Sequence, residues 1–113
     1  IAFNFSENTG KRLENIVFIE LMRQGLEIYY HAGKNECDFI IKKGLKITKA
    51  IQVCLSLDNP ETKKREFNGL VEALREYSLK EGLILTFDKE YEIKERDKII
   101  IVKPVWKWLL EKE

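Results

Sequence analysis

The alternation of apolar and polar positions predicts one helix, three strands, a second helix, three more strands and a short final helix. The first helix is expected at about Gly10 to Gln24, because apolar side chains recur there at helical spacing and a glycine follows. The residues that carry this pattern are Leu13, Val17, Phe18, Leu21 and Gly25.

Alternating or continuously apolar segments predict the strands. LEIYYH (26–31) and ECDFIIKK (36–43) flank the turn-forming AGKN, so they are expected to form a hairpin. Residues 46–57 are expected to be a third strand, with Gln52 and Cys54 on one face. GLILTF (82–87) has the apolar composition of an interior strand, and two more strands follow. The opposite face of the third strand is expected to carry the apolar residues Ile47, Ile51, Val53 and Leu55.

The second helix has the clearest pattern. Asn59 and Pro60 suit its cap and first position, and an i, i+3, i+4, i+7 apolar stripe extends to Leu79. Pro104 is expected to open a last helix whose tryptophans cover apolar surface. The order αβββαβββα predicts an α/β fold with a mixed central sheet flanked by helices, in a single domain that spans residues 1–113.

Composition narrows the class of protein. Apolar residues make up 44% and charged residues 35% of 113, and no apolar run reaches the ~18 residues needed to cross a membrane. We therefore expect a soluble, cytoplasmic domain with reduced Cys37 and Cys54. The net charge of +1 does not by itself require an anionic partner. Because the chain begins with Ile1 rather than Met, we expect it to be a piece of a longer protein.

Glu14 is the first candidate for a site residue. At about 100° per residue, it falls between Leu21 and Phe18 on a helical wheel, inside the apolar arc. A carboxylate that faces a core is costly unless it is paired, hydrogen-bonded or bound to a metal ion. Two interpretations stay open: a site role, or a partly exposed acid that suits the helix dipole near the N-terminal end.

Asp38 is the second candidate. It interrupts the apolar strand 36–43, either as a site residue or as the acid of a plain sheet edge. Pairing of the second and third strands would bring the face of Gln52 and Cys54 beside it. The alternative interpretation of Gln52 and Cys54 is that they are ordinary packing residues of the strand. His31 is the only histidine, and the sequence offers no Ser/His/Asp or Cys/His arrangement, so triad chemistry is not expected. On the second strand, Asp38 is expected to share a face with Glu36 and Ile40, opposite Cys37, Phe39 and Ile41.

A resemblance covers nearly the whole chain. GKRLENIVFIELMRQG, IYYHAGKNECDFIIKKG, AIQVCLSLDNPETKKREFNGL, GLILTFD and VKPVWKWLL occur in this order. The combination resembles the C-terminal domain of unknown function found on predicted archaeal and bacterial AAA-type ATPases. That family is similar to the PD-(D/E)xK, or restriction-endonuclease-like, nucleases. The resemblance implies a nuclease-like fold at the C-terminal end of a longer ATPase.

The resemblance also implies a site. In the nuclease pattern a helical Glu, a strand Asp and an acid-x-Lys pair surround one or two divalent metal ions. Glu14 and Asp38 match the first two positions, whereas Gln52 replaces the second strand acid and Cys54 replaces the lysine. Glu14, Asp38 and Gln52 could bind Mg²⁺ or Mn²⁺ weakly, because Mg²⁺ accepts neutral oxygen ligands. Lys63, one turn before the apolar stripe of the second helix, is either a replacement cation or a solvated surface residue.

Three functions follow as hypotheses. The first is a nuclease-fold domain with a degenerate site that serves nucleic-acid contact or assembly for an AAA-type ATPase. The second is an active, divalent-metal-dependent DNA endonuclease. The third is a protein-interaction domain that docks on the ATPase portion through Trp106, Trp108, Leu109 and Leu110, which otherwise cover the domain's own core. The sequence contains no GxxxxGK[ST] loop and so is not expected to hydrolyse ATP.

Overall fold

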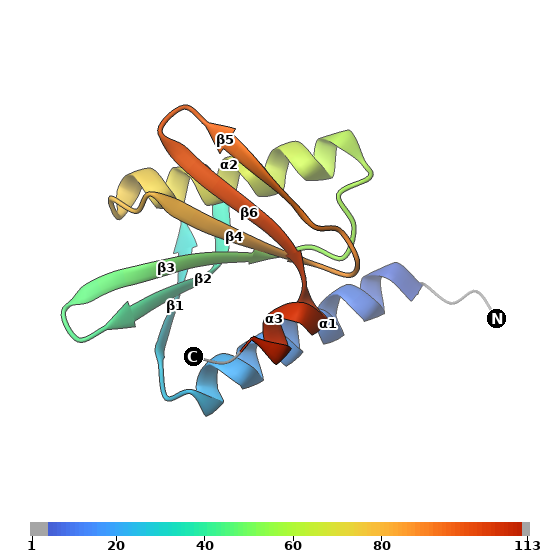
Figure 1. The fold of residues 1–113 in the computed structure, drawn as a ribbon, viewed down its shortest axis with the longest axis horizontal. Helices are drawn as coiled ribbons and strands as arrows, with labels where there is room; N and C mark the ends of the chain where they lie inside the picture. Colours follow the sequence, from blue (N-terminus) through green and yellow to red (C-terminus); the bar gives the residue numbers. More distant parts are fainter. Residues whose placement is uncertain (1–4, 112–113) are drawn as a thin grey trace.

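The computed structural model describes residues 5–111 and confirms the α/β fold and the predicted order of elements (Figure 1). Six strands form one open, mixed sheet in the order β1-β2-β3-β4-β6-β5. The β3–β4 and β4–β6 pairs are parallel, and the β1–β2, β2–β3 and β5–β6 pairs are antiparallel. The elements are α1 Phe5–Arg23, β1 Glu27–Ala32, β2 Glu36–Lys43, β3 Lys46–Val53, α2 Pro60–Glu76, β4 Glu81–Thr86, β5 Tyr91–Glu95, β6 Lys98–Pro104 and α3 Val105–Leu110.

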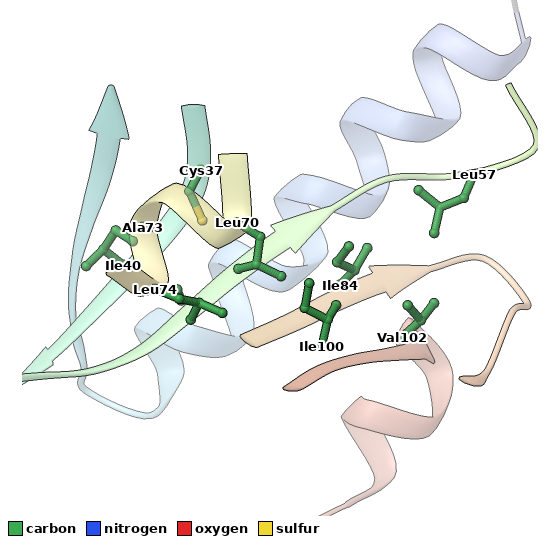
Figure 2. Packing of buried hydrophobic residues seen from close by; sticks show 10 residues of the cluster. Cys37, Ile40, Leu57, Leu70, Ala73, Leu74, Ile84, Ile100 and Val102 are labelled. Carbon is green, nitrogen blue, oxygen red and sulfur yellow. The ribbon is translucent and has the colours of Figure 1, made fainter. Parts of the chain in front are cut away.

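The helices cover the two faces of the sheet. Helix α2 packs on one face, where Leu70, Ala73 and Leu74 meet side chains of β2, β4 and β6 (Figure 2). Helices α1 and α3 lie together on the other face, over Ile51 and Leu85 (Figure 1). Burial on both faces explains why β4 is continuously apolar in sequence. Within residues 5–111, no helix has the length and apolar character that a membrane crossing needs.

Helix α1 begins at Phe5, five residues before the predicted start, and buries a narrower stripe than its apolar residues suggest. Leu13, Val17 and Leu21 are buried, whereas Phe18 is 41% and Met22 55% exposed. Only the strip directly over the sheet is covered. Glu14 lies beside that strip and is exposed overall, although the helical wheel places it inside the apolar arc.

Two β-bulges change the predicted faces of β2 and β3. Between β1 and β2 the register shifts after Tyr29↔Ile40, so Cys37 and Ile40 both pack on the α2 side. Between β2 and β3 the extra residue is Thr48, which moves Ile47 to the α2 side while Ile51 stays on the α1 side. The predictions for Cys37 and Ile47 were therefore wrong. Simple alternation fails because each bulge inserts one unpaired residue.

Helix α2 begins as predicted and ends three residues earlier than predicted. The Asn59 side chain accepts hydrogen bonds from the backbone N–H groups of Glu61 and Thr62. Ser78 adopts a φ of 55°, which stops the helix. In the middle of the helix, a Cβ added to Gly69 would lie 1.9 Å from the carbonyl oxygen of Glu36. The glycine therefore allows α2 to approach the start of β2.

The predicted bounds of β2 agree with the structure, whereas several other predicted ends differ by one to four residues. Strand β3 ends at Val53 rather than at residue 57, although the Cys54 N–H still donates to the Leu85 carbonyl at 2.9 Å. The last helix covers the core with only part of its apolar surface: Trp108 packs beside the buried Val105, whereas Trp106 is 59% exposed. The prediction that both tryptophans cover the core holds for Trp108 alone.

Candidate functional site

A pocket of about 420 Å³ opens between α1 and α2 at the end of the sheet where β2 begins and β3 ends. Three of the residues nominated from the sequence line it: Glu14, Asp38 and Cys54. Gln52 and Lys63 do not. We call it the acid pocket; its remaining lining comes from Gly10, Lys11, Val53, Leu55, Ser56, Thr62, Arg65 and Glu66.

The pocket exists because β2 and β3 separate there. Their ladder begins with the pair Phe39↔Ile51, and Asp38 lies just outside it. Asp38 replaces the missing ladder bonds: its Oδ2 accepts the Val53 N–H at 2.8 Å, and its own N–H donates to Gln52 Oε1 at 2.9 Å. The prediction that strand pairing brings Asp38 beside Gln52 is thus confirmed.

The side-chain amide of Gln52 connects three elements through hydrogen bonds. It is only 2% exposed, and its Nε2 donates to the carbonyl oxygens of Glu36 at 2.9 Å and Glu66 at 3.0 Å. Its Oε1 is taken by the N–H of Asp38. The side chain therefore ties β3 to β2 and α2, and its oxygen is directed at the backbone rather than into the pocket.

Asp38 has a strongly raised pKa. Burial is the largest cause, since it disfavours the charged carboxylate, and it outweighs the opposing hydrogen bond from Val53. Neighbouring charge adds to the effect: Glu14 lies close enough to form a side-chain hydrogen bond with Asp38, and Glu66 also raises its pKa. Together they raise the pKa of Asp38 to about 7. Asp38 therefore keeps its proton to a much higher pH than an ordinary aspartate does.

Glu66 is the third carboxyl group in this pocket. It was not identified as a site residue from the sequence. Its side chain is 16% exposed, Oε2 lies 3.6 Å from Arg65 Nε, and Oε1 is buried without a hydrogen-bond partner. Burial is the main reason that its pKa is raised. A recognisable sign was available: Glu66 precedes Leu70 by four and Ala73 by seven residues, which places an acid on the buried stripe of α2.

Cys54 lies in the acid pocket, where the resemblance expects a lysine. Its Sγ donates to the Ser56 carbonyl at 3.1 Å. Burial, and then the negative charge of Glu66, raise the pKa of this thiol to about 11, so it is neutral at ordinary pH. The cations that line the pocket are Lys11 and Arg65, neither of which was nominated from the sequence.

Lys63 lies away from the acid pocket. Its ammonium group is 5.8 Å from the centroid of the Phe67 ring and 5.7 Å from that of Tyr91. Both distances are within the range of cation–π attraction, which accounts for the position of Lys63 at the edge of the sheet.

The side chains of the acid pocket meet only some of the requirements for binding a divalent cation. Carboxylate oxygens of the kind supplied by Glu14, Asp38 and Glu66 are the ligands that Mg²⁺ and Mn²⁺ prefer. Gln52 offers no oxygen to such an ion, because its amide is fully engaged. In the part of the chain that the structure describes, no three His, Cys, Asp or Glu side chains are grouped so that they could hold a metal ion.

A second polar group lies under the other end of α2, and we call it the histidine cluster. His31 is 7% exposed; its Nε2 lies 2.7 Å from Glu72 Oε2, and its Nδ1 lies 3.0 Å from the Tyr77 hydroxyl. Glu72 Oε1 accepts from both the backbone and the side-chain nitrogen of Asn35, each at 3.0 Å. These bonds fasten the β1–β2 hairpin to α2.

Comparison with known proteins places the chain beside one archaeal sequence. An uncharacterized protein of Methanocaldococcus jannaschii, MJ1544, is 34% identical over 120 aligned residues. The alignment covers 96% of this chain and 26% of the relative, so the chain spans about a quarter of that protein's length. The homologous segment in the relative is thus part of a larger protein. No family model matches the sequence, and no solved structure matches it.

Proposed function

We propose that this chain is a nuclease-like domain with a degenerate site, which serves nucleic-acid contact or assembly for a larger AAA-type ATPase. The proposal rests on the sequence resemblance and on the αβββαβββα order. It also fits the M. jannaschii relative, in which the homologous segment is about a quarter of the protein. The observation that carries it is the state of Gln52 and Cys54.

These two residues stand where the nuclease pattern needs an acid and a lysine. The amide of Gln52 is used up in three hydrogen bonds to backbone groups, and Cys54 is a neutral thiol. One well-placed electrostatic contact lowers a reaction barrier by ~3 to 4 kcal/mol, which is a hundredfold or more in rate. Loss of a ligand and of a cation therefore favours a site that does not cleave efficiently.

Exposed apolar side chains support the assembly role. Ile16, Ile19 and Met22 lie on the outward face of α1 and are 42%, 56% and 55% exposed. Helices that carry apolar residues on both sides are usually covered on both sides. Trp106 and Leu110 of α3 are also largely exposed. Such surface suits contact with the rest of a larger protein.

The test combines metal binding with cleavage. Mn²⁺ binding is measured by calorimetry on the wild type and on Asp38→Asn, and the same samples are incubated with single-stranded, duplex and branched DNA. The proposal expects at most weak Mn²⁺ binding, which Asp38→Asn abolishes, and no cleavage by either protein. Efficient Mn²⁺-dependent cleavage that depends on Asp38 would overturn the degenerate site.

An active metal-dependent nuclease is the second candidate. The shared pocket of Glu14, Asp38 and Glu66 favours it, because acids whose pKa is raised by burial and by a neighbouring carboxylate, as those of Asp38 and Glu66 are, are typical of functional sites. Arg65 lines the same pocket and would supply the positive charge that Cys54 lacks. In that case Arg65→Gln and Glu66→Gln would each lower the cleavage rate, whereas Lys63→Gln would leave it unchanged.

A further inference from the structure

Positive charge is concentrated at the end of the sheet opposite to the acid pocket. Between Asp38 and Asp58 the sequence contains four lysines and no acidic residue, although the whole chain has 20 basic and 19 acidic residues. The four lysines are in the β2–β3 hairpin. The rest of the chain is therefore net acidic, and the near-neutral total conceals a separation of charge.

The pairing register places three of these lysines on one face. Lys43 pairs with Lys46, and Lys49 pairs with Ile41, whose side chain packs on the α1 side of the sheet. Residues paired across an antiparallel ladder, and residues two apart along a strand, share a face. Lys43, Lys46 and Lys49 thus follow one another on the α1 side, over about 7 Å of strand. We call them the lysine face.

The hairpin that carries the lysine face projects from the sheet. Strand β4 pairs with β3 only from Ile51 onward, so the first half of β3 and the turn extend past it (Figure 1). Leu45 at the turn is 96% exposed. None of the ion pairs among the described residues involves a lysine of the hairpin. These ammonium groups are therefore available to a partner.

A hollow of about 440 Å³ continues from the lysine face. Thr48 and Lys49 form one side of it and Lys80 another, while Leu21 and Trp108 contribute apolar lining. Its acids are Glu81 and Glu111, and Glu111 is held at 2.6 Å by Lys103. The hairpin and the hollow together form a predominantly basic, partly concave surface.

We infer that the lysine face binds the phosphate backbone of a nucleic acid. The inference rests on the proposed function and names the surface by which the domain would make its nucleic-acid contact. A row of ammonium groups on a projecting strand suits repeated phosphates, which attract Lys independently of base sequence. The acid pocket repels them, and along β2 it lies about five residues, or ~17 Å, from Lys43. An anionic membrane fits less well, because membrane-surface binding needs a broad apolar face and the turn exposes only Leu45.

The test compares two triple variants with equal loss of charge. Lys43→Gln/Lys46→Gln/Lys49→Gln removes the lysine face. Lys34→Gln/Lys64→Gln/Lys89→Gln removes three exposed lysines elsewhere. Binding of a fluorescent 20-base-pair DNA duplex is followed by anisotropy between 50 and 200 mM NaCl with EDTA present, after circular dichroism has shown that both variants fold.

The expected result is a loss of affinity of at least tenfold in the first variant, with a salt slope shallower by about 2 to 3, since each phosphate contact contributes about 0.9. The second variant should stay within about threefold of the wild type. Equal losses of DNA affinity in both variants, or no loss in the first, would overturn the inference that the lysine face binds phosphates, while leaving the proposed function standing. Failure of the wild type to bind DNA at 50 mM NaCl, with binding to phosphatidylserine vesicles instead, would overturn both this inference and the nucleic-acid role.

Discussion

Two carboxyl groups six residues apart on α2 have opposite environments. Glu72 in the histidine cluster receives hydrogen bonds from His31 and Asn35, and these partners lower its pKa. Glu66 in the acid pocket is buried beside other acids with one oxygen unpartnered, and burial raises its pKa. A polar group whose bonds are all formed within the fold stabilises it. A group left without partners costs stability, and such groups are typical of sites shaped for something other than folding.

The largest expected effect is in the histidine cluster. His31→Ala should lower the free energy of unfolding by about 3 kcal/mol, because it leaves a cavity and removes one hydrogen-bond partner each from Glu72 and Tyr77. Urea unfolding at pH 7 measures the change. Tyr30→Ala is the matched control, since this neighbouring side chain is 56% exposed and should matter by less than about 1 kcal/mol. Equal effects of the two variants would show that the histidine cluster contributes little.

The acid pocket should respond in the opposite direction. Asp38→Asn keeps an oxygen that can accept the Val53 N–H. It removes a partly buried carboxyl group whose pKa is raised to about 7. At pH 8, with EDTA present, the variant should be more stable than the wild type by about 2 kcal/mol, which allows for partial exposure of the pocket. Asp58→Asn, at an exposed position, should change nothing. A destabilised Asp38→Asn protein would mean that the carboxylate is structural.

The pH dependence of stability should separate the two regions further. An acid with a raised pKa favours the folded state at low pH, and Asp38's contribution is lost as the pH rises from about 4 through 7. Glu72, with its lowered pKa, contributes above about pH 4.5 and loses that contribution as the pH falls. Melting temperatures between pH 3 and 8 should therefore decline less toward neutral pH in Asp38→Asn than in the wild type. In Glu72→Gln, the melting temperature should instead fall less than in the wild type as the pH drops below about 4.5.

The sequence predicted the fold well because its apolar periods are strong. The order of elements and the start of α2 follow from the stripe around Leu70 and Leu74 and from the Asn59 cap. The bulges at Thr48 and near Asp38 were not predictable, since they depend on how neighbouring strands pair. Their consequence was the wrong face for Ile47 and Cys37.

The candidate site was predictable only in part. Asp38 was identified from its place in an apolar strand, and Glu14 from its position inside the apolar arc of the helical wheel. Cys54 was identified from the strand face that it shares with Gln52 and from the resemblance. All three line the acid pocket. The burial of the Gln52 amide against three backbone groups was not visible, because all three groups belong to other elements, two to β2 and one to α2. Glu66 was detectable on the α2 stripe, yet it was hidden within the charged run KKRE. Positions four and seven residues before a buried apolar residue identify such acids better than local composition does.

The smallest expected effect tests whether Glu66 and Cys54 share one electrostatic environment. Burial is the main cause of the raised pKa of Cys54, and the charge of Glu66 comes second. Glu66→Gln should therefore lower the pKa of this thiol modestly and speed its alkylation by iodoacetamide at pH 8 by ~3-fold, since a half-unit shift changes the thiolate fraction by that factor.

Mass spectrometry distinguishes Cys54 from the fully buried Cys37, which should remain unlabelled in the folded protein. Glu61→Gln, at an exposed position in the first turn of α2, provides the matched control. An unchanged rate in Glu66→Gln would mean that solvent or Arg65 screens the carboxylate from the thiol, and the acid pocket would then be two separate polar sites. A faster rate in Glu66→Gln alone would tie α2 to the ends of β2 and β3 as one electrostatic unit, the arrangement that distinguishes this pocket from the self-sufficient histidine cluster.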